Sequence, residues 1–149
     1  MAIKKNDPIP ADNHILRYIK WNNLCKDENN VVIGVLAEAF KERDTESYLS
    51  ANWLEYFPGN QQQQTICAVQ ELRKCFRVKP KECFAIGKVG DIKSACAKYN
   101  TVKIHIVSKP TNANKSHVSV KMYPNDNMAL LELLATEAWC KLIHNSAIP

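Results

Sequence analysis

Strands are expected where polar and apolar side chains alternate or where β-branched residues run together. Residues 14–19 (H-I-L-R-Y-I) alternate, which puts His14 and Arg17 on opposite faces of a strand. The apolar, β-branched run V-V-I-G-V-L-A-E-A-F at 31–40 predicts a buried strand. The run E-C-F-A-I-G-K-V at 82–89 predicts another.

Loops and turns are expected at the start of the chain and after the first strand. Residues 1–13 contain two prolines and several Asp and Asn residues before any periodic pattern, so they predict a flexible N-terminal segment. Residues 21–30 (W-N-N-L-C-K-D-E-N-N) predict mostly turn. A helix over 35–43 is an alternative to the end of the buried strand, because A-E-A-F-K-E-R has a helix-forming composition.

The densest aromatic stretch, L-S-A-N-W-L-E-Y-F at 49–57, predicts a short helix that ends at Pro58-Gly59. Asn52 and Glu55 have the three-residue spacing of a capping box, in which each side chain bonds the backbone amide of the other residue. The apolar residues that recur every three to four positions and would share its buried face are Leu49, Trp53, Tyr56 and Phe57. Capping is therefore the first interpretation of Asn52 and Glu55, and Glu55 is kept as a candidate catalytic carboxylate.

Three further helices are expected. One runs from Asn60 to about residue 76, a short one follows a turn at Gly90-Asp91, and the last spans residues 126–144. The inner face of the first is marked by Ile66, Val69, Leu72 and Phe76. The last helix is apolar over so much of its circumference that it must be buried in its own fold or against another chain.

A hairpin is expected between residues 101–107 and 116–123, joined by the polar loop 109–115. Strict alternation points Val102, Ile104, Ile106, Val118, Val120 and Met122 inward. The outward face then collects Lys103, His105, His117, Ser119, Lys121 and Tyr123.

Together these elements predict a single α+β domain over residues 1–149, with a mainly antiparallel sheet of about five strands and packed helices. The composition agrees, since 46% hydrophobic and 23% charged residues among 149 are typical of a globular domain.

The six cysteines predict neither a disulfide framework nor a metal site. There is no C-x-x-C pair, and the nearest cysteines are eight residues apart, so no metal ligand set is expected. Dinucleotide and phosphate-binding glycine motifs are missing among only four glycines, and no cofactor is expected.

The first residues of the sequence have no apolar core of signal-peptide length, and no apolar run is long enough to span a membrane. A cytoplasmic protein without a membrane partner is therefore predicted.

The net charge of +5 is divided unevenly along the chain. Residues 1–72 hold seven Lys or Arg against ten Asp or Glu, and residues 73–149 hold thirteen against five. The candidate nucleic-acid-binding residues lie in the basic part and are Arg73, Lys74, Arg77, Lys79, Lys81 and Lys121. A cationic helix end and a solvated surface are the alternative interpretation. Phe76 is interleaved among them, but the helical pattern assigns it to the core.

Two groups of residues have the chemistry of phosphoester cleavage without a metal. On the predicted hairpin, His117 and His105 next to Lys121 could supply acid, base and a cation, although an exposed strand face of a basic protein collects such residues anyway. His14 and Arg17 form the second group, in which Arg17 would hold an anion. Because they point to opposite faces of a strand, they would cooperate only if the segment bends.

Five blocks of the sequence occur in this order: H-I-L-R-Y at 14–18, A-F-K-E-R at 39–43, L-S-A-N-W-L-E-Y-F at 49–57, F-A-I-G-K-V at 84–89 and S-H at 116–117. In this order they resemble a group of small uncharacterised bacterial proteins that has no known activity. The resemblance spans most of the chain and implies kinship in fold. The positions that it matches are His14, Arg17, Arg43, Ser50, Asn52, Trp53, Glu55 and His117.

Two functions are therefore expected from different classes. The first is a non-enzymatic interaction module of a bacterial intracellular complex, which docks a protein partner or a second copy through the aromatic segment or the last helix. The second is an RNA-binding or phosphoester-cleaving protein that uses His, Arg and Lys side chains. The second function needs at least two histidines in one cleft if they are to act as acid and base.

Overall fold

The computed structural model describes residues 3–41, 47–99, 103–124 and 126–149. Its strands are β1 (His14–Ile19), β2 (Leu24–Lys26), β3 (Val32–Val35), β4 (Tyr48–Trp53), β5 (Cys83–Lys88), β6 (His105–Ser108), β7 (His117–Lys121) and β8 (Lys141–His144). Six of them form one antiparallel sheet in the order β6-β7-β4-β1-β5-β8, and β2 and β3 form a separate hairpin. The expected α+β class is confirmed, with six strands in the main sheet instead of five.

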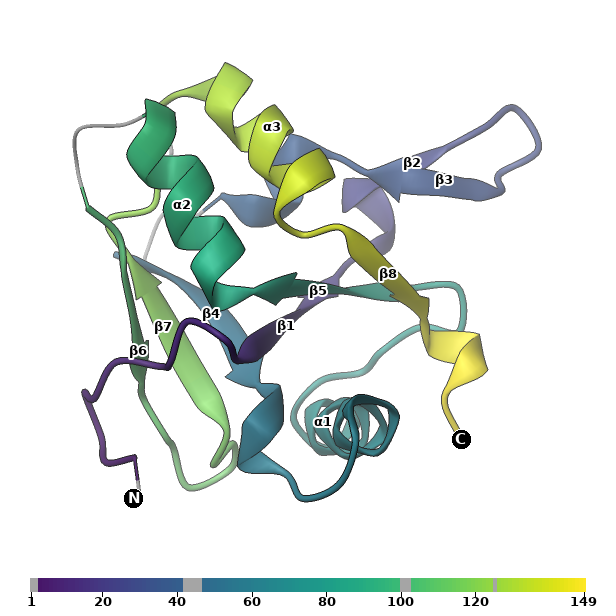
Figure 1. Ribbon diagram of the computed structural model, residues 1–149. Coiled ribbons are helices and arrows are strands. Elements are labelled where there is room, and N and C mark those ends of the chain that lie inside the picture. Colours follow the sequence, from purple (N-terminus) through teal and green to yellow (C-terminus); the bar gives the residue numbers. More distant parts are fainter. Residues whose placement is uncertain (1–2, 42–46, 100–102, 125) are drawn as a thin grey trace.

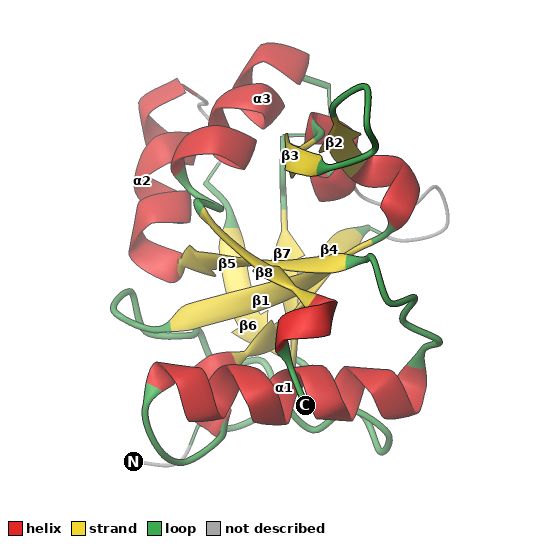
Figure 2. Cartoon of the chain, turned by 90° about the vertical axis from the view of Figure 1, so that its right-hand side faces the viewer, coloured by secondary structure: helices red, strands yellow, loops and turns green. Residues whose placement is uncertain are grey.

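Three helices cover the two faces of the sheet. They are α1 (Gln61–Cys75), α2 (Val89–Tyr99) and α3 (Met128–Glu137). In Figures 1 and 2, α1 lies alone across one face, and α2 and α3 cover the other. The β2–β3 hairpin extends away from the body of the molecule on the side of α3 (Figure 1). No helix among the described residues is long and apolar enough to cross a membrane.

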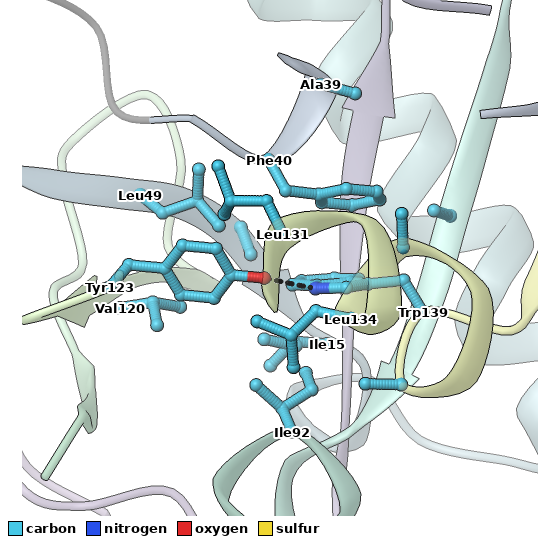
Figure 3. Packing of buried hydrophobic residues seen from close by; sticks show 14 of the residues in the cluster. Ile15, Ala39, Phe40, Leu49, Ile92, Val120, Tyr123, Leu131, Leu134 and Trp139 are labelled. Carbon is cyan, nitrogen blue, oxygen red and sulfur yellow. Dashed lines mark hydrogen bonds between the residues drawn. The ribbon is translucent and has the colours of Figure 1, made fainter. Parts of the chain in front are cut away.

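The larger core lies between the sheet and the α2–α3 layer, and its aromatic centre is drawn in Figure 3. Phe40 stacks on Trp139 with ring centroids 4.9 Å apart. The indole Nε1 of Trp139 donates a hydrogen bond to the hydroxyl of Tyr123 at 3.1 Å, so its polar atom is satisfied in the core. Both partners are buried, and burial raises the pKa of Tyr123.

The smaller core lies under α1, where Leu16, Phe84 and Ile86 of the sheet meet Val69 and Leu72 of the helix. The expected helix from Asn60 is confirmed. The Asn60 side chain accepts from the Gln63 amide at 2.9 Å, and the Gln63 side chain accepts from the Asn60 amide at 2.8 Å. The capping box of this protein is therefore at 60–63.

The helix expected at 49–57 is wrong. Residues 48–53 form β4, which pairs with β7 over five residues, and only Leu54–Tyr56 make a turn of 3-10 helix. The sequence Y-L-S-A-N-W alternates as well as it repeats every three to four residues, and strand pairing decides between the two spacings. Asn52 is thus a buried strand residue, not a helix cap.

The buried strand expected at 31–40 is also corrected. β3 pairs only with β2, and Val31 and Ile33 are 57% and 64% exposed. Residues 21–30, expected to be mostly turn, contain β2. A turn follows this strand, and in it Asn30 has a φ of 61°. Of the alternative helix at 35–43, residues Ala37–Phe40 form a 3-10 turn, and residues 42–46 lie outside the described part.

The last helix is shorter than expected. α3 ends at Glu137, and Lys141–His144 form β8 on the edge of the sheet beside β5. This pairing satisfies the backbone at that edge of β5. Close approach is possible because Gly87 has no side chain, since a Cβ there would lie 3.0 Å from the carbonyl oxygen of Ala138. The apolar face of α3, expected to be buried in its own fold or against another chain, is buried in its own core.

The hairpin of 101–107 and 116–123 is present as β6 and β7, with its pattern changed at the end. Met122 has a φ of 63° and is exposed, and this turn in the backbone brings Tyr123 inward. Ser119 is buried, contrary to the expected outward position. Val102 lies outside the described residues, and the expected turn at Gly90-Asp91 is already part of α2.

The N-terminal segment follows the outer edge of β6. The amide of Asn6 bonds the Ser108 carbonyl at 2.7 Å, and the amide of Ile9 bonds the Ile106 carbonyl at 2.9 Å. Ile9 is buried in the larger core. This segment thus occupies the edge of the sheet that β6 would otherwise expose.

Candidate functional site

The main sheet opens between its two central strands. β1 pairs with β5 along all six of its residues, but with β4 only at Ile15 opposite Trp53 and at Leu16 opposite Asn52. Beyond Leu16 the two strands diverge, and the first half of β4 pairs only with β7. A cleft of about 560 Å³ lies at this opening.

Side chains from distant parts of the sequence line the cleft. Its walls come from β1, β4 and β7, the end of α1, the 3-10 turn at 37–40 and the loop between β6 and β7. The loop touches the end of α1, where the Cys75 thiol donates to the carbonyl of Ala113 at 3.3 Å. The polar and charged lining residues are Arg17, Lys20, Asn23, Glu38, Lys41, Ser50, Asn52, Asn114 and His117.

Arg17 holds the diverging strands together. Its Nη1 donates to the carbonyl of Ser50 at 2.6 Å, and its Nε donates to the carbonyl of Ala39 at 2.7 Å. Since β1 has diverged from β4 at this point, the Ser50 carbonyl accepts its hydrogen bond from the Arg17 guanidinium and not from a backbone amide of β1. A permanent positive charge is fixed at the cleft by this arrangement.

Ser50 and His117 form a hydrogen-bonded pair across β4 and β7. The Nδ1 of His117 lies 2.8 Å from the carbonyl oxygen of Lys109. Because a carbonyl only accepts, this contact assigns the proton to Nδ1 and leaves Nε2 of the neutral ring as an acceptor. Nε2 lies 3.2 Å from the Oγ of Ser50. The pair thus has the order hydroxyl, imidazole and orienting acceptor that activates a serine nucleophile.

A buried amide network lies beside this pair. The Nδ2 of Asn52 donates to Oδ1 of Asn114 at 2.6 Å and to Oγ of Ser116 at 2.7 Å. Both hydrogens of the Asn52 amide are therefore used within the protein. Asn52 fixes the wall of the cleft and is not a donor toward a substrate oxyanion.

The charge of the cleft is positive. Arg17, Lys20 and Lys41 line it against a single carboxylate, Glu38, among the described residues. Lys20 and Lys41 are exposed at the rim. A cleft with this balance favours an anionic ligand.

His14 and Glu55 form a separate pair. The Nδ1 of His14 lies 2.7 Å from Oε2 of Glu55, and the backbone amide of His14 donates to Oε1 at 2.7 Å. The carboxylate thus accepts from both the ring and the backbone of one residue. All four histidines lie in the described part of the chain, and only His117 lines the cleft.

The predicted nucleic-acid-binding residues fall into four places. Arg73 donates to the side chain and carbonyl of Asn145, and so fastens the C-terminal segment to α1. Lys74 pairs with Glu71 at 3.2 Å on the surface. The residues that border a second hollow next to the cleft are Arg77, Lys79 and Lys81, whereas Lys121 lies on β7 and lines neither hollow.

A buried carboxylate supports the wall of the cleft at Tyr18. Glu82 accepts from the hydroxyl of Tyr18, from the amide of Lys79 at 2.7 Å and from the amide of Trp21 at 2.8 Å. Burial alone would raise the pKa of Glu82, but these hydrogen bonds outweigh it and lower the pKa below its ordinary value. Burial and the contact with Glu82 raise the pKa of Tyr18.

All six cysteines are free. The most buried are Cys83 and Cys96, and burial raises the pKa of each to about 11. The Sγ of Cys83 lies 3.5 Å from Nδ1 of His144, but the thiol has no exposed surface. Among the described residues no group of three His, Cys, Asp or Glu side chains is placed to hold a metal ion.

Arg17 and His117 belong to different groups of candidate residues in the sequence, and the structure brings them into one cleft. The pairing of Ser50 with His117 and the lining residues Lys20 and Lys41 were not predicted. The alternation of Tyr48, Ser50 and Asn52 could have placed Ser50 on the strand face that carries polar side chains. No local pattern in the sequence indicates that Lys20 and Lys41 line a cleft. Arg43, matched only by the resemblance, lies outside the described residues.

Comparisons with known proteins identify no relative of this chain. No protein-family model matches it, and no similarity was found to a curated protein or to a solved structure. The cleft, with Ser50, His117 and Arg17, is therefore the feature from which a function is inferred.

Proposed function

We propose that the protein binds an anionic phosphoester in the cleft between β1 and β4 and cleaves it with Ser50 as nucleophile and His117 as base. The observation that carries this proposal is the oriented Ser50–His117 pair in a positively charged cleft. Its distances are 3.2 Å from Oγ to Nε2 and 2.8 Å from Nδ1 to the Lys109 carbonyl. Both lie within hydrogen-bond reach, as nucleophilic catalysis requires.

The first step forms a phosphoseryl group. His117 takes the proton of Ser50, Oγ attacks phosphorus, and the bond from phosphorus to the leaving oxygen breaks. The leaving oxygen departs on the side of phosphorus opposite Oγ and takes its proton from solvent, so the imidazolium keeps the proton of Ser50. His117 is thus the base of this step. The expected pair of histidines in one cleft is not found among the described residues, and solvent takes the role of the second histidine.

The second step restores the serine. Water attacks phosphorus on the side opposite Ser50 and loses a proton to solvent, and the bond between phosphorus and Ser50 Oγ breaks. The imidazolium of His117 returns its proton to the serine oxygen. The sum is an ester plus water giving an alcohol and a phosphate. Lys20 and Lys41 at the rim stabilise the charge on the phosphoryl oxygens, and Arg17 adds its positive charge to the cleft.

A phosphoester is favoured over a carboxylic ester for two reasons. The charge of the cleft matches an anion. Acyl transfer needs unengaged donors for an oxyanion, and the nearby Asn52 amide already donates to Asn114 and Ser116.

Hydrolysis of a chromogenic phosphodiester, bis(4-nitrophenyl) phosphate, tests the proposal. Ser50→Ala and His117→Gln should each lower the rate by about 100-fold or more, because each removes one half of the nucleophile-base pair. His105→Gln is the matched control, since His105 is exposed on β6 outside the cleft. Equal rates for wild type and Ser50→Ala would contradict the proposal.

A separate observation favours a second function, the docking of a protein partner or another copy of the chain. The β2–β3 hairpin carries Val31 and Ile33 in exposed positions and extends from the body of the molecule (Figure 1). Exposed apolar residues on a projecting hairpin are suited to pairing with another surface.

Light scattering at rising protein concentration tests this second function. The wild type should gain mass, and the double variant Val31→Lys with Ile33→Lys should not. A wild type that stays monomeric and a pull-down without a partner would contradict it.

A further inference from the structure

A second hollow of about 540 Å³ lies next to the cleft. It is lined by Trp21 and Pro80 and by three cationic residues, Arg77, Lys79 and Lys81. The ammonium group of Lys26 lies 4.2 Å from the centre of the Trp21 ring, but Lys26 does not line the hollow. An aromatic ring beside cations is the combination that holds a base and its phosphates.

The cleft and the hollow are linked at three points, although no residue lines both. Along the chain the lining passes from the cleft at Lys20 to the hollow at Trp21, and again from the cleft at Phe76 to the hollow at Arg77. The third link is Glu82, which lines the hollow and whose carboxylate binds the hydroxyl of Tyr18 in the cleft. The two depressions are thus adjacent.

Phe76, which lines the cleft, supplies a second aromatic surface beside Trp21 of the hollow. The helical pattern of α1 assigned it to the core, but the side chain is 45% exposed. Its ring lies 6.1 Å from that of Tyr18 with an angle of 30° between the planes, so one face is supported and the ring is held in place. An exposed and supported ring is suited to stacking a base.

Cations accompany both aromatic surfaces. Lys20, Lys41 and Arg17 line the cleft, and the three residues of segment 77–81 line the hollow. Of the two acids among the described lining residues, Glu82 is only 3% exposed and is engaged by three donors, which leaves Glu38 as the exposed one. Cations therefore outnumber acids in the described lining of both depressions, which suits a chain of phosphates.

From the adjacency of two depressions that each combine an aromatic ring with cations, we infer that the ligand of the cleft is a single-stranded nucleic acid. One phosphate lies at Ser50 and His117, one base stacks on Phe76, and a neighbouring base enters the hollow beside Trp21. Two separated aromatic surfaces need at least two nucleotides, and a duplex keeps its base faces stacked inside the helix. The inference rests on the proposed role of the cleft as the phosphate site, and it names the class of phosphoester.

Fluorescence anisotropy with a labelled ten-nucleotide RNA of mixed sequence tests the inference. The full chain should bind the RNA at low salt, and Phe76→Ala should weaken binding by about 5- to 100-fold through the loss of one stacked base. Arg77→Gln with Lys79→Gln should weaken binding and lower the slope of log affinity against log salt by about 1.4, or about 0.7 for each lost phosphate contact. The matched control is Lys5→Gln with Lys88→Gln, two exposed lysines that line neither depression, and it should keep most of the affinity.

Competing ligands separate the alternatives. Unlabelled single-stranded RNA or DNA should displace the probe, and a stronger effect of RNA would assign the source to RNA. Equal displacement by the matching duplex or by an acidic peptide would overturn the inference, and so would equal losses in the aromatic, basic and control variants. Trp21→Phe, which keeps an aromatic ring in the hollow, should bind more tightly than Trp21→Leu.

Ser50→Ala separates this inference from the chemistry proposed above. The variant should bind the RNA as the wild type does and leave it intact. RNA binding that depends on Phe76 supports the inference even when neither protein cleaves the strand, and in that case the cleavage mechanism fails. A reactive Ser50 in a protein that binds no single strand would overturn the inference and leave the phosphoester mechanism standing.

Discussion

At the scale of single residues, the candidate site depends on the hydrogen-bond partners of two side chains, Arg17 and His117. Arg17 replaces the backbone donors that β4 loses when β1 diverges, and the Lys109 carbonyl sets the tautomer of His117. The identities of Arg17 and His117 could be proposed from the sequence because their side chains suit phosphate chemistry. Their partners could not, since the contacts are main-chain carbonyls of distant residues.

Glu82 provides a prediction at the same scale. Glu82→Gln should lower the free energy of unfolding by about 2 kcal/mol at neutral pH, because an amide offers one acceptor oxygen where three donors converge on two. Urea unfolding measures the change. Glu71→Gln is the control, since its exposed pair with Lys74 should contribute less than about 0.5 kcal/mol.

The same residue predicts a dependence on pH. The pKa of Glu82 is lower in the folded protein than its ordinary value of 4.5, so its contribution is present above pH 4.5 and is lost as the pH falls below that value. Unfolding experiments across this range should show a shallower loss of stability in Glu82→Gln than in the wild type. Parallel curves for the two proteins would show that Glu82 is not the group that titrates.

At the scale of elements, local pattern predicted a strand or helix correctly where only one period fitted the sequence. Residues 14–19 alternate and 61–75 repeat every three to four positions, and both elements are as expected. Residues 48–53 fit both periods, and pairing with β7 selects the strand. At 31–35 the β-branched residues indicated a strand correctly, but pattern alone could not tell an exposed hairpin from a buried strand.

Gly87 gives the prediction at this scale, because α2 and the end of α3 meet β5 there. A Cβ at Gly87 would lie 2.8 Å from Cδ1 of Ile92 and 3.0 Å from the Ala138 carbonyl oxygen. Gly87→Ala should therefore destabilise the protein by about 1–3 kcal/mol, measured by thermal or urea unfolding. The control is Gly34→Ala on β3, where a Cβ would meet only Cys25 at 3.9 Å, and its stability should change by less than about 0.5 kcal/mol. Equal effects of the two changes would show that helix and strand do not pack closely at Gly87.

At the scale of the whole molecule, the order of strands creates the cleft. The sequence predicted an α+β domain with an antiparallel sheet, but it could not predict that β1 lies between β4 and β5. Arg17 and Ser50 are 33 residues apart, and Ser50 and His117 are 67 apart, so only the tertiary fold brings the three together. The basic second part of the chain adds Arg77, Lys79 and Lys81, which line the adjacent hollow.

The central claim is that His117 activates Ser50 in this cleft, and covalent labelling with a fluorophosphonate tests it most directly. An activated serine displaces fluoride and keeps the phosphonyl group, whatever the natural substrate is. Mass spectrometry of the intact protein and of its peptides should show one adduct, at Ser50, in the wild type and in His105→Gln. His117→Gln and Ser50→Ala should show none. An unlabelled wild-type protein, or labelling that persists in His117→Gln, would contradict the account.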